Sequence, residues 1–249
     1  MIRDRYRPAE FDAERYSADN LAFWTPIMIR LGRIGRDDSV LDLGCATGGF
    51  TNAIAESSGA YLVGCDMSPA MIDYAGVQRA GSPARWVGAD ATRLPVAHHS
   101  FSRVVASLVV HQLPDRELAL HEVARVLTAG GVLLIRTVTP EAARQWIPNR
   151  FFPSVARAQA GRMPPVDELV ELLRGLGFDD VTTETVVRHK PLALADIEMS
   201  CSRDLADRYP FVGTRERDEG FARMRDHWAA RRGTCVDARE FRFVIASKA

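Results

Sequence analysis

The sequence predicts an α/β fold in which a doubly wound, mostly parallel sheet carries helices on both faces. Short apolar runs alternate with helical segments between residues 39 and 138, which is the pattern of successive β-α-β units. The runs are almost continuously apolar, as in strands that are covered on both faces. A glycine-rich turn joins the first run to the first helical segment. We therefore expect parallel strands joined by right-handed crossovers.

The order of elements follows from apolar runs and from the residues that interrupt them. We expect strands at 40–43, 61–65, 85–89, 103–110 and 132–138, and helices at 50–56, 68–79 and 116–127. Beyond them we expect a Pro- and Arg-rich irregular stretch at 140–165, a helix at 166–176, a strand at 181–187, a long helical segment at about 192–232 and a strand at 241–247. Gly130 and Gly131 are expected to stop the helix before the fifth strand.

The first 35 residues mix charged and aromatic side chains and are predicted to form an N-terminal helical lid. Pro26 is expected near the start of a short helix over residues 27–31. Residues 36–249 then form one domain, with cap insertions at about 139–165 and 192–235.

Composition excludes several classes of protein. The 249 residues contain 32 Lys and Arg against 32 Asp and Glu, whereas nucleic-acid binders usually carry a basic excess. The four cysteines form no CxxC pair, so we expect a reduced, cytoplasmic protein without a metal site. No apolar run approaches 18 residues, so no membrane span is expected.

The glycine-rich turn is the first candidate binding feature. Gly44, Gly48 and Gly49 follow a predicted strand and open a helix. Glycine allows a positive φ and a close approach of the backbone to a ligand. The free N–H groups of the helix start favour a polar or anionic group. A tight turn with a purely structural role has the same pattern.

Carboxylates follow successive predicted strands at the edge where open α/β sheets bind ligands. Asp42 lies within the first strand, Asp66 ends the second and Asp90 follows the third. Asp66 is suited to accept hydrogen bonds from two ribose hydroxyls, and Asp90 from an exocyclic adenine amine. Either carboxylate alone could instead be a helix N-cap.

Five segments in order give the chain a specific resemblance: VLDLGCATGG, VGCDMSPAMI, VGADATRLP, FSRVVASLVVHQLPD and EVARVLTAGGVLLI. Residues 38–138 resemble the class I S-adenosylmethionine (SAM)-dependent methyltransferases, in the ubiquinone/menaquinone-biosynthesis-like subgroup that acts on small molecules. The resemblance implies a Rossmann-like sheet of seven strands whose last strand is antiparallel. Ala46 departs from the family, which often has glycine there, and is expected to narrow the turn without abolishing binding.

The resemblance also implies a set of cofactor contacts. Asp42 and the turn would hold the methionine part of SAM, Asp66 and Met67 the ribose and one adenine face, Asp90 and Ala91 the adenine, and Ser107 the methionine end. The implied cofactor-binding residues are Asp42, Gly44, Cys45, Ala46, Gly48, Asp66, Met67, Asp90, Ala91 and Ser107. A nicotinamide dehydrogenase is the alternative for the turn, but the Asp90 segment and the VVHQLPD segment have no role in one.

His111 follows the fourth strand and is the candidate general base, because imidazole titrates near neutral pH. A structural role in shaping the pocket is the alternative. Aromatic residues of the N-terminal segment and the two insertions either wall an apolar acceptor pocket or form the core of a helical cap; they are Tyr6, Tyr16, Trp24, Trp146, Phe151, Phe152, Tyr209, Phe211 and Trp228.

These observations predict an enzyme that methylates a small molecule, with O-methylation of an apolar or aromatic metabolite favoured over C- or N-methylation. A SAM-binding protein that catalyses a rearrangement or cyclisation without methyl transfer is the alternative of another class. No nucleic-acid or membrane partner is expected. The protein is expected to be a monomer or homodimer.

Overall fold

The computed structural model describes residues 7–231, 233 and 235–249. The chain divides into two compact units. The sheet unit comprises Met1–Thr137, Val166–Glu184 and Phe243–Ala249, and the insert unit comprises Val138–Pro165 and Thr185–Arg242. Tyr6, one of the aromatic residues considered above, lies outside the described residues.

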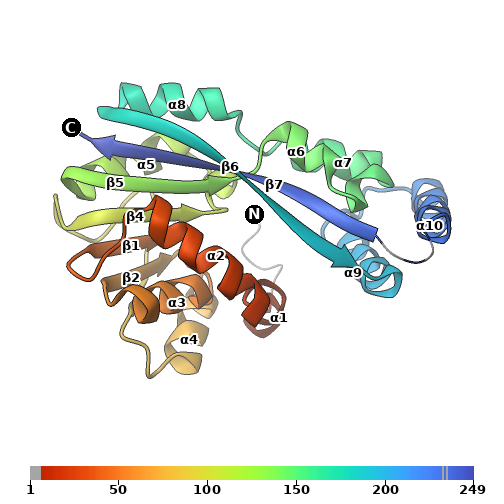
Figure 1. Cartoon of the computed structure of the whole chain (residues 1–249), viewed down its shortest axis with the longest axis horizontal. Coiled ribbons are helices and arrows are strands. Elements are labelled where there is room, and N and C mark those ends of the chain that lie inside the picture. Colours follow the sequence, from red (N-terminus) through yellow and green to blue (C-terminus); the bar gives the residue numbers. More distant parts are fainter. Residues whose placement is uncertain (1–6, 232, 234) are drawn as a thin grey trace. The chain divides into compact units, whose positions relative to one another are not determined.

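The central feature is a seven-stranded sheet with the order β3-β2-β1-β4-β5-β7-β6 (Figure 1). Strands β1 to β5 pair in parallel, and the last strand is antiparallel, so the predicted fold class is confirmed. The strands are β1 (Ser39–Leu43), β2 (Tyr61–Asp66), β3 (Arg85–Gly88), β4 (Phe101–Ser107), β5 (Leu127–Thr137), β6 (Phe178–Leu192) and β7 (Cys235–Lys248).

Helices of the sheet unit cover both faces of the sheet. The helical segments here are α1 (Pro8–Arg15), α2 (Ala18–Leu31), α3 (Gly49–Ser58), α4 (Pro69–Gln78), η2 (Val110–Gln112), α5 (Arg116–Val126) and α8 (Val166–Gly175). Helices α2 and α3 pack together on one face, whereas α5 and α8 contribute to the core of the other. Among the described residues, no helix combines the length and apolar character that crossing a bilayer requires.

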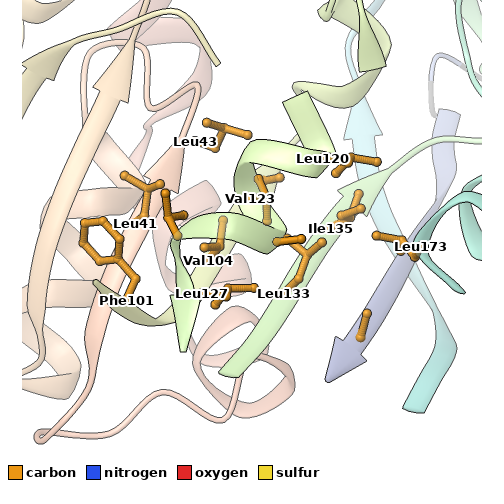
Figure 2. Packing of buried hydrophobic residues seen from close by; sticks show 14 of the residues in the cluster. Leu41, Leu43, Phe101, Val104, Leu120, Val123, Leu127, Leu133, Ile135 and Leu173 are labelled. Carbon is orange, nitrogen blue, oxygen red and sulfur yellow. The ribbon is translucent and has the colours of Figure 1, made fainter. Parts of the chain in front are cut away.

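In the core beneath α5 and α8, every second residue of a strand points toward these helices, and the residues between them point to the other face of the sheet. Leu41, Leu133 and Ile135 point from their strands toward Leu120 and Val123 of α5 (Figure 2). All five are at most 1% exposed, and burying each side chain contributes about 1.5–3 kcal/mol before entropy costs. The intervening residues of β1 and β5, including Asp42 and Arg136, therefore face α2 and α3.

The predicted roles of Pro26 as a helix start and of Gly130 and Gly131 as a helix stop were wrong. Pro26 lies inside α2, which begins eight residues earlier, where the Ser17 hydroxyl caps the helix by accepting from the Asn20 N–H at 3.3 Å. Pro26 is tolerated because it lies on the exposed side of the helix. Gly130 and Gly131 do not stop α5; they lie within β5, beside a register irregularity with β4, where Gly130 has φ 70°.

The fourth strand and the helical segment after residue 192 also differ from prediction. β4 ends at Ser107, because Leu108 adopts a left-handed φ of 57° and turns the chain into η2. The segment after residue 192 comprises two helices, α9 (Leu194–Asp207) and α10 (Thr214–Ala229).

The stretch 140–165 is helical rather than irregular. It forms α6 (Pro140–Gln145), η3 (Pro148–Arg150) and α7 (Pro153–Ala160), each with proline in its first positions. Proline suits those positions because its missing N–H has no helical partner there. The prolines that suggested an irregular segment therefore mark three helix starts.

The insert unit has its own apolar core. Phe151, Phe152, Tyr209 and Trp228 are all buried in one cluster with side chains of α9 and α10. Trp228 also donates from Nε1 to the Leu192 carbonyl at 3.1 Å. These four rings thus form the core of a helical unit, the second of the two roles considered above, whereas Phe211 is 60% exposed.

Candidate functional site

The turn between β1 and α3 is held in left-handed backbone conformations. Gly44 has φ 73°, Ala46 has φ 49° and Gly48 has φ 77°. An alanine in this region costs on the order of 1 kcal/mol, and the Ala46 N–H donates to Asp66 Oδ2 at 3.0 Å. The one departure from the family pattern is therefore accommodated in a glycine-like conformation that a carboxylate of the next strand stabilises.

The turn glycines are closely covered by side chains of the sheet unit. A Cβ on Gly44 would overlap Val109, a Cβ on Gly48 would overlap the Trp86 ring, and a Cβ on Gly49 would overlap the Tyr16 ring. The protein's own packing thus requires glycine at these positions.

Asp66, the last residue of β2, connects two backbone segments at the carboxyl edge of the sheet. Its Oδ2 accepts from the Ala46 N–H at 3.0 Å, and its Oδ1 accepts from the Ser68 N–H at 2.9 Å. Each carboxylate oxygen has a second lone pair. Asp66 therefore orders the turn and the approach to α4, and it retains acceptor capacity for a ligand.

Asp42 is a buried carboxylate on the face of β1 that α3 covers. It is 4% exposed, and its Oδ2 accepts from Thr51 Oγ1 at 2.5 Å. The pKa of Asp42 is raised from 3.8 to about 6, chiefly because the carboxyl group is buried; the Thr51 hydrogen bond opposes this rise and the nearby Asp66 carboxylate adds to it. Asp42 and Asp66 are thus close enough to interact, and a cationic ligand group could lie near both carboxylates.

The buried Asp42 should make stability depend on pH. Its pKa is higher in the folded protein than its ordinary value of 3.8, so the folded state binds this proton more tightly. The contribution of this proton to the free energy of unfolding is fully present below about pH 4. It falls by on the order of 2–3 kcal/mol as the pH rises through 6. Urea unfolding from pH 4.5 to 7.5 should show this fall for the wild type relative to Asp42→Asn. A pH-independent difference would contradict the assignment.

Sequence reasoning named Tyr16 only as an aromatic wall or core residue, and it did not identify Asp12, Thr47 or Arg79, which fasten the N-terminal segment to the turn. Asp12 Oδ1 accepts from Thr47 Oγ1 at 2.7 Å and forms an ion pair with Arg79 at 2.5 Å. The Tyr16 hydroxyl donates to the Cys45 carbonyl at 3.2 Å, and burial raises the pKa of this phenol. Neither α1 nor Tyr16 carries a motif, so only the fold shows that they cover the turn. The proposed lid function of residues 1–35 stays a prediction.

Asp90, Ala91 and Met67 follow the strands that the sequence predicted. Asp66 pairs with Gly88, so Asp90 lies just beyond that edge of β3. The Asp90 side chain is exposed and accepts at Oδ1 from the Thr92 N–H at 3.0 Å and from Thr92 Oγ1 at 2.9 Å. It therefore stabilises its own loop as an Asx turn, whereas Met67 is half-buried directly after Asp66.

The segment after β4 contacts the turn through Val109, and His111 follows in the same segment. Val109 packs on Gly44, and His111 lies two residues further, in η2, with its Nδ1 atom buried. Ser107 ends β4 and lies in register with Arg136 of β5. The sequence-predicted residues from β1, β2, β3 and β4 therefore gather at one edge of the sheet, as expected for parallel strands.

Arg136 is another residue that sequence reasoning missed. It is 4% exposed, and its guanidinium lies 4.1 Å from the Trp24 ring centroid and 5.4 Å from that of Phe50. The available signal was a single charged residue within the apolar strand VLLIRTV.

Comparisons with known proteins identify the class of protein that has this fold. The methyltransferase domain family matches residues 41–135. A demethylmenaquinone methyltransferase of Mycobacterium sp. (strain JLS) is 33% identical over 65% of this chain and 74% of its own length. A malonyl-[acyl-carrier protein] O-methyltransferase of Hahella chejuensis is 34% identical over 45% of this chain, and the match spans 40% of that relative.

Among solved structures, a methyltransferase from an antibiotic biosynthesis pathway of Anabaena variabilis ATCC 29413, described as putative, shares the fold with a TM-score of 0.70. It is 19% identical and covers 93% of this chain and 98% of that one. The chain belongs to the class I SAM-dependent methyltransferases that act on small molecules. SAM is the cofactor of this family, so the nicotinamide alternative for the turn falls away.

Proposed function

We propose that this protein transfers the methyl group of SAM to a hydroxyl oxygen of an apolar or aromatic small molecule. The observation that carries the proposal is the position of His111, directly after the segment in which Val109 packs on Gly44. Methyl transfer to a neutral hydroxyl requires removal of a proton, whereas an amine already offers its lone pair. A histidine at this edge is suited to that task because imidazole accepts protons near neutral pH.

The edge fits the proposed cofactor in charge and in hydrogen-bonding capacity. SAM supplies an electrophilic methyl group on a positively charged sulfur when it is bound. The carboxylates of Asp42 and Asp66 can attract that positive charge, and Asp66 has lone pairs beyond those that accept from Ala46 and Ser68. We assign the ribose to Asp66, the ammonium group to Asp42, and the adenine to the neighbourhood of Met67, Asp90 and Ala91.

The chain's own residues would contribute by orientation and proton removal. The turn from Gly44 to Gly49 and the strand end at Ser107 would fix the position of the methyl donor, and orientation of this kind can supply much of the acceleration. His111 would hold the proton released by the acceptor hydroxyl.

The names of the relatives give different acceptors and do not decide among acceptor classes for this chain. One is named as an O-methyltransferase of malonyl-[acyl-carrier protein] and another as a methyltransferase of demethylmenaquinone. C- or N-methylation is the alternative within the family, and a rearrangement or cyclisation is the alternative outside methyl transfer.

An assay with radiolabelled SAM and matched phenolic, carboxylic, amine and carbon acceptors distinguishes O-methylation from these alternatives. Labelled product only from amines or carbon acids contradicts the proposal, as does tight SAM binding without labelled product from any extract.

His111→Ala should reduce turnover while sparing cofactor binding. We expect kcat to fall on the order of 100-fold, which is the lower range for general-base catalysis, and the affinity for S-adenosylhomocysteine to stay within about twofold. The acidic limb of the kcat/KM pH profile should also disappear. His121→Ala is the matched control, because His121 lies exposed on α5. Full activity of His111→Ala at neutral pH would remove His111 as the base.

A further inference from the structure

A groove of about 530 Å³ lies between α2 and α3 in the sheet unit. The two helices pack together on one face of the sheet (Figure 1). The volume of the groove is within the range of small-molecule sites. Its walls are mostly small or apolar and include Leu21, Ala22, Pro26, Ile29, Ala53 and Ser57. The α3 residues of this lining belong to the second half of the helix, whereas the glycine-rich turn precedes its first residue.

Thr25 supplies a polar group to this groove. It is a lining residue, and only 5% of it is exposed. Its Oγ1 atom is buried, and no group in the described part of the chain forms a hydrogen bond with it. A threonine within a helix can bond its hydroxyl to a carbonyl oxygen three or four residues earlier, but Thr25 does not. A buried hydroxyl without a partner is destabilising, so a ligand that bonds to Thr25 removes a cost that the protein otherwise bears.

Pro26 leaves an acceptor on the same groove. It lies inside α2, and proline has no N–H to donate to the carbonyl oxygen four residues earlier, which belongs to Ala22. Ala22 and Pro26 both line the groove and are exposed. Residues three apart are neighbours on a helix surface, so the Ala22 carbonyl lies close to the Thr25 side chain. The groove therefore presents a donor and an acceptor side by side between apolar walls.

These two groups select the chemistry of a ligand. A single hydroxyl group matches both, because its oxygen accepts from Thr25 and its hydrogen donates to the Ala22 carbonyl. Arg30 is the charged residue of the lining, and it is already paired with Glu184 at 2.7 Å. We infer that this groove binds a small apolar molecule that carries one hydroxyl group, an alcohol or a phenol. The site is separate from the carboxyl edge of the sheet, and its occupation requires no methyl transfer.

Three probes of similar shape test the inference. The hydroxyl of 4-ethylphenol donates and accepts, the oxygen of 4-ethylanisole only accepts, and 4-ethyltoluene does neither. NMR titration of the methyl-labelled full chain should shift the resonances of Ile29 and Ala53, which line the groove. We expect 4-ethylphenol to bind about threefold more tightly than 4-ethylanisole, and 4-ethyltoluene to bind most weakly, since one neutral hydrogen bond contributes a factor of about this size.

Two substitutions test the two polar groups separately. Pro26→Ala restores an N–H for the Ala22 carbonyl and suits a helix interior, so 4-ethylphenol should lose its advantage while 4-ethylanisole stays within about twofold of the wild type. Thr25→Val keeps the shape of the side chain, so 4-ethylphenol and 4-ethylanisole should both bind about threefold more weakly and 4-ethyltoluene should be unaffected. Thr182→Val is the matched control, because Thr182 is exposed on β6, and it should leave all three affinities unchanged.

Four results would overturn the inference. Equal affinities of the three probes for the wild type would show apolar contact alone, and wild-type affinities in both variants would exclude the two polar groups. Displacement of 4-ethylphenol by S-adenosylhomocysteine would place the probe at the carboxyl edge instead. An affinity for 4-ethylphenol that falls as the protein concentration rises would show that a second copy of the chain occupies the groove.

Discussion

Asp66→Ala is expected to weaken the binding of S-adenosylhomocysteine by at least tenfold at neutral pH. Losing a hydrogen bond to a charged acceptor costs about 1.5–3 kcal/mol, and Asp66 is proposed to provide two such bonds to the ribose. The substitution also frees the N–H groups of Ala46 and Ser68, so the turn loses its support. Both effects lower affinity, and titration calorimetry measures their sum.

Two further variants separate these effects. Asp73→Ala removes an exposed carboxylate of α4 and should leave affinity unchanged, which controls for net charge. Asp66→Asn keeps the shape of the side chain and one acceptor oxygen, so it should restore part of the thermal stability and little of the affinity. Wild-type affinity in Asp66→Ala would reject the ribose assignment.

Gly48→Ala is expected to have the largest effect on stability, about 3 kcal/mol in the free energy of unfolding. Two costs add at this position. The residue has φ 77°, which costs an alanine about 1–2 kcal/mol, and its Cβ would overlap the Trp86 ring, which adds on the order of 1–3 kcal/mol. Urea unfolding at pH 7.5 measures the total, and cofactor affinity should fall with it because the turn must shift.

Gly48 precedes the first residue of α3, and the glycine that follows the last residue of this helix offers a matched control. Gly59 ends α3 with φ 71°, and its nearest potential Cβ contact is Arg36 at 3.6 Å. Gly59→Ala therefore measures the backbone cost alone and should lose about 1–2 kcal/mol. Trp86→Leu should restore part of the stability of Gly48→Ala. Equal losses in the two glycine variants would show that the Trp86 contact contributes nothing.

The parallel strands were predictable because their signals are local. Continuous apolar runs and the glycines that interrupt them predicted the ends of β1, β2 and β3 to within one or two residues. Errors occurred where a residue has two compatible roles. Proline breaks a helix interior but suits a helix start, as at Pro140 and Pro153, and it is tolerated on the exposed side of α2. Glycine ends helices but also fits a strand irregularity, as at Gly130.

By itself the sequence determined the fold class, the cofactor family and the edge at which Asp42, Gly44, Asp66 and His111 gather, because these depend on motif order and on parallel strands sharing one end. Only the tertiary structure decided what covers that edge. Tyr16 against Gly49, Trp86 against Gly48, and Arg136 between Trp24 and Phe50 join segments that are distant along the chain. Such contacts have no local periodicity, since they arise only when strand order and register place the side chains together.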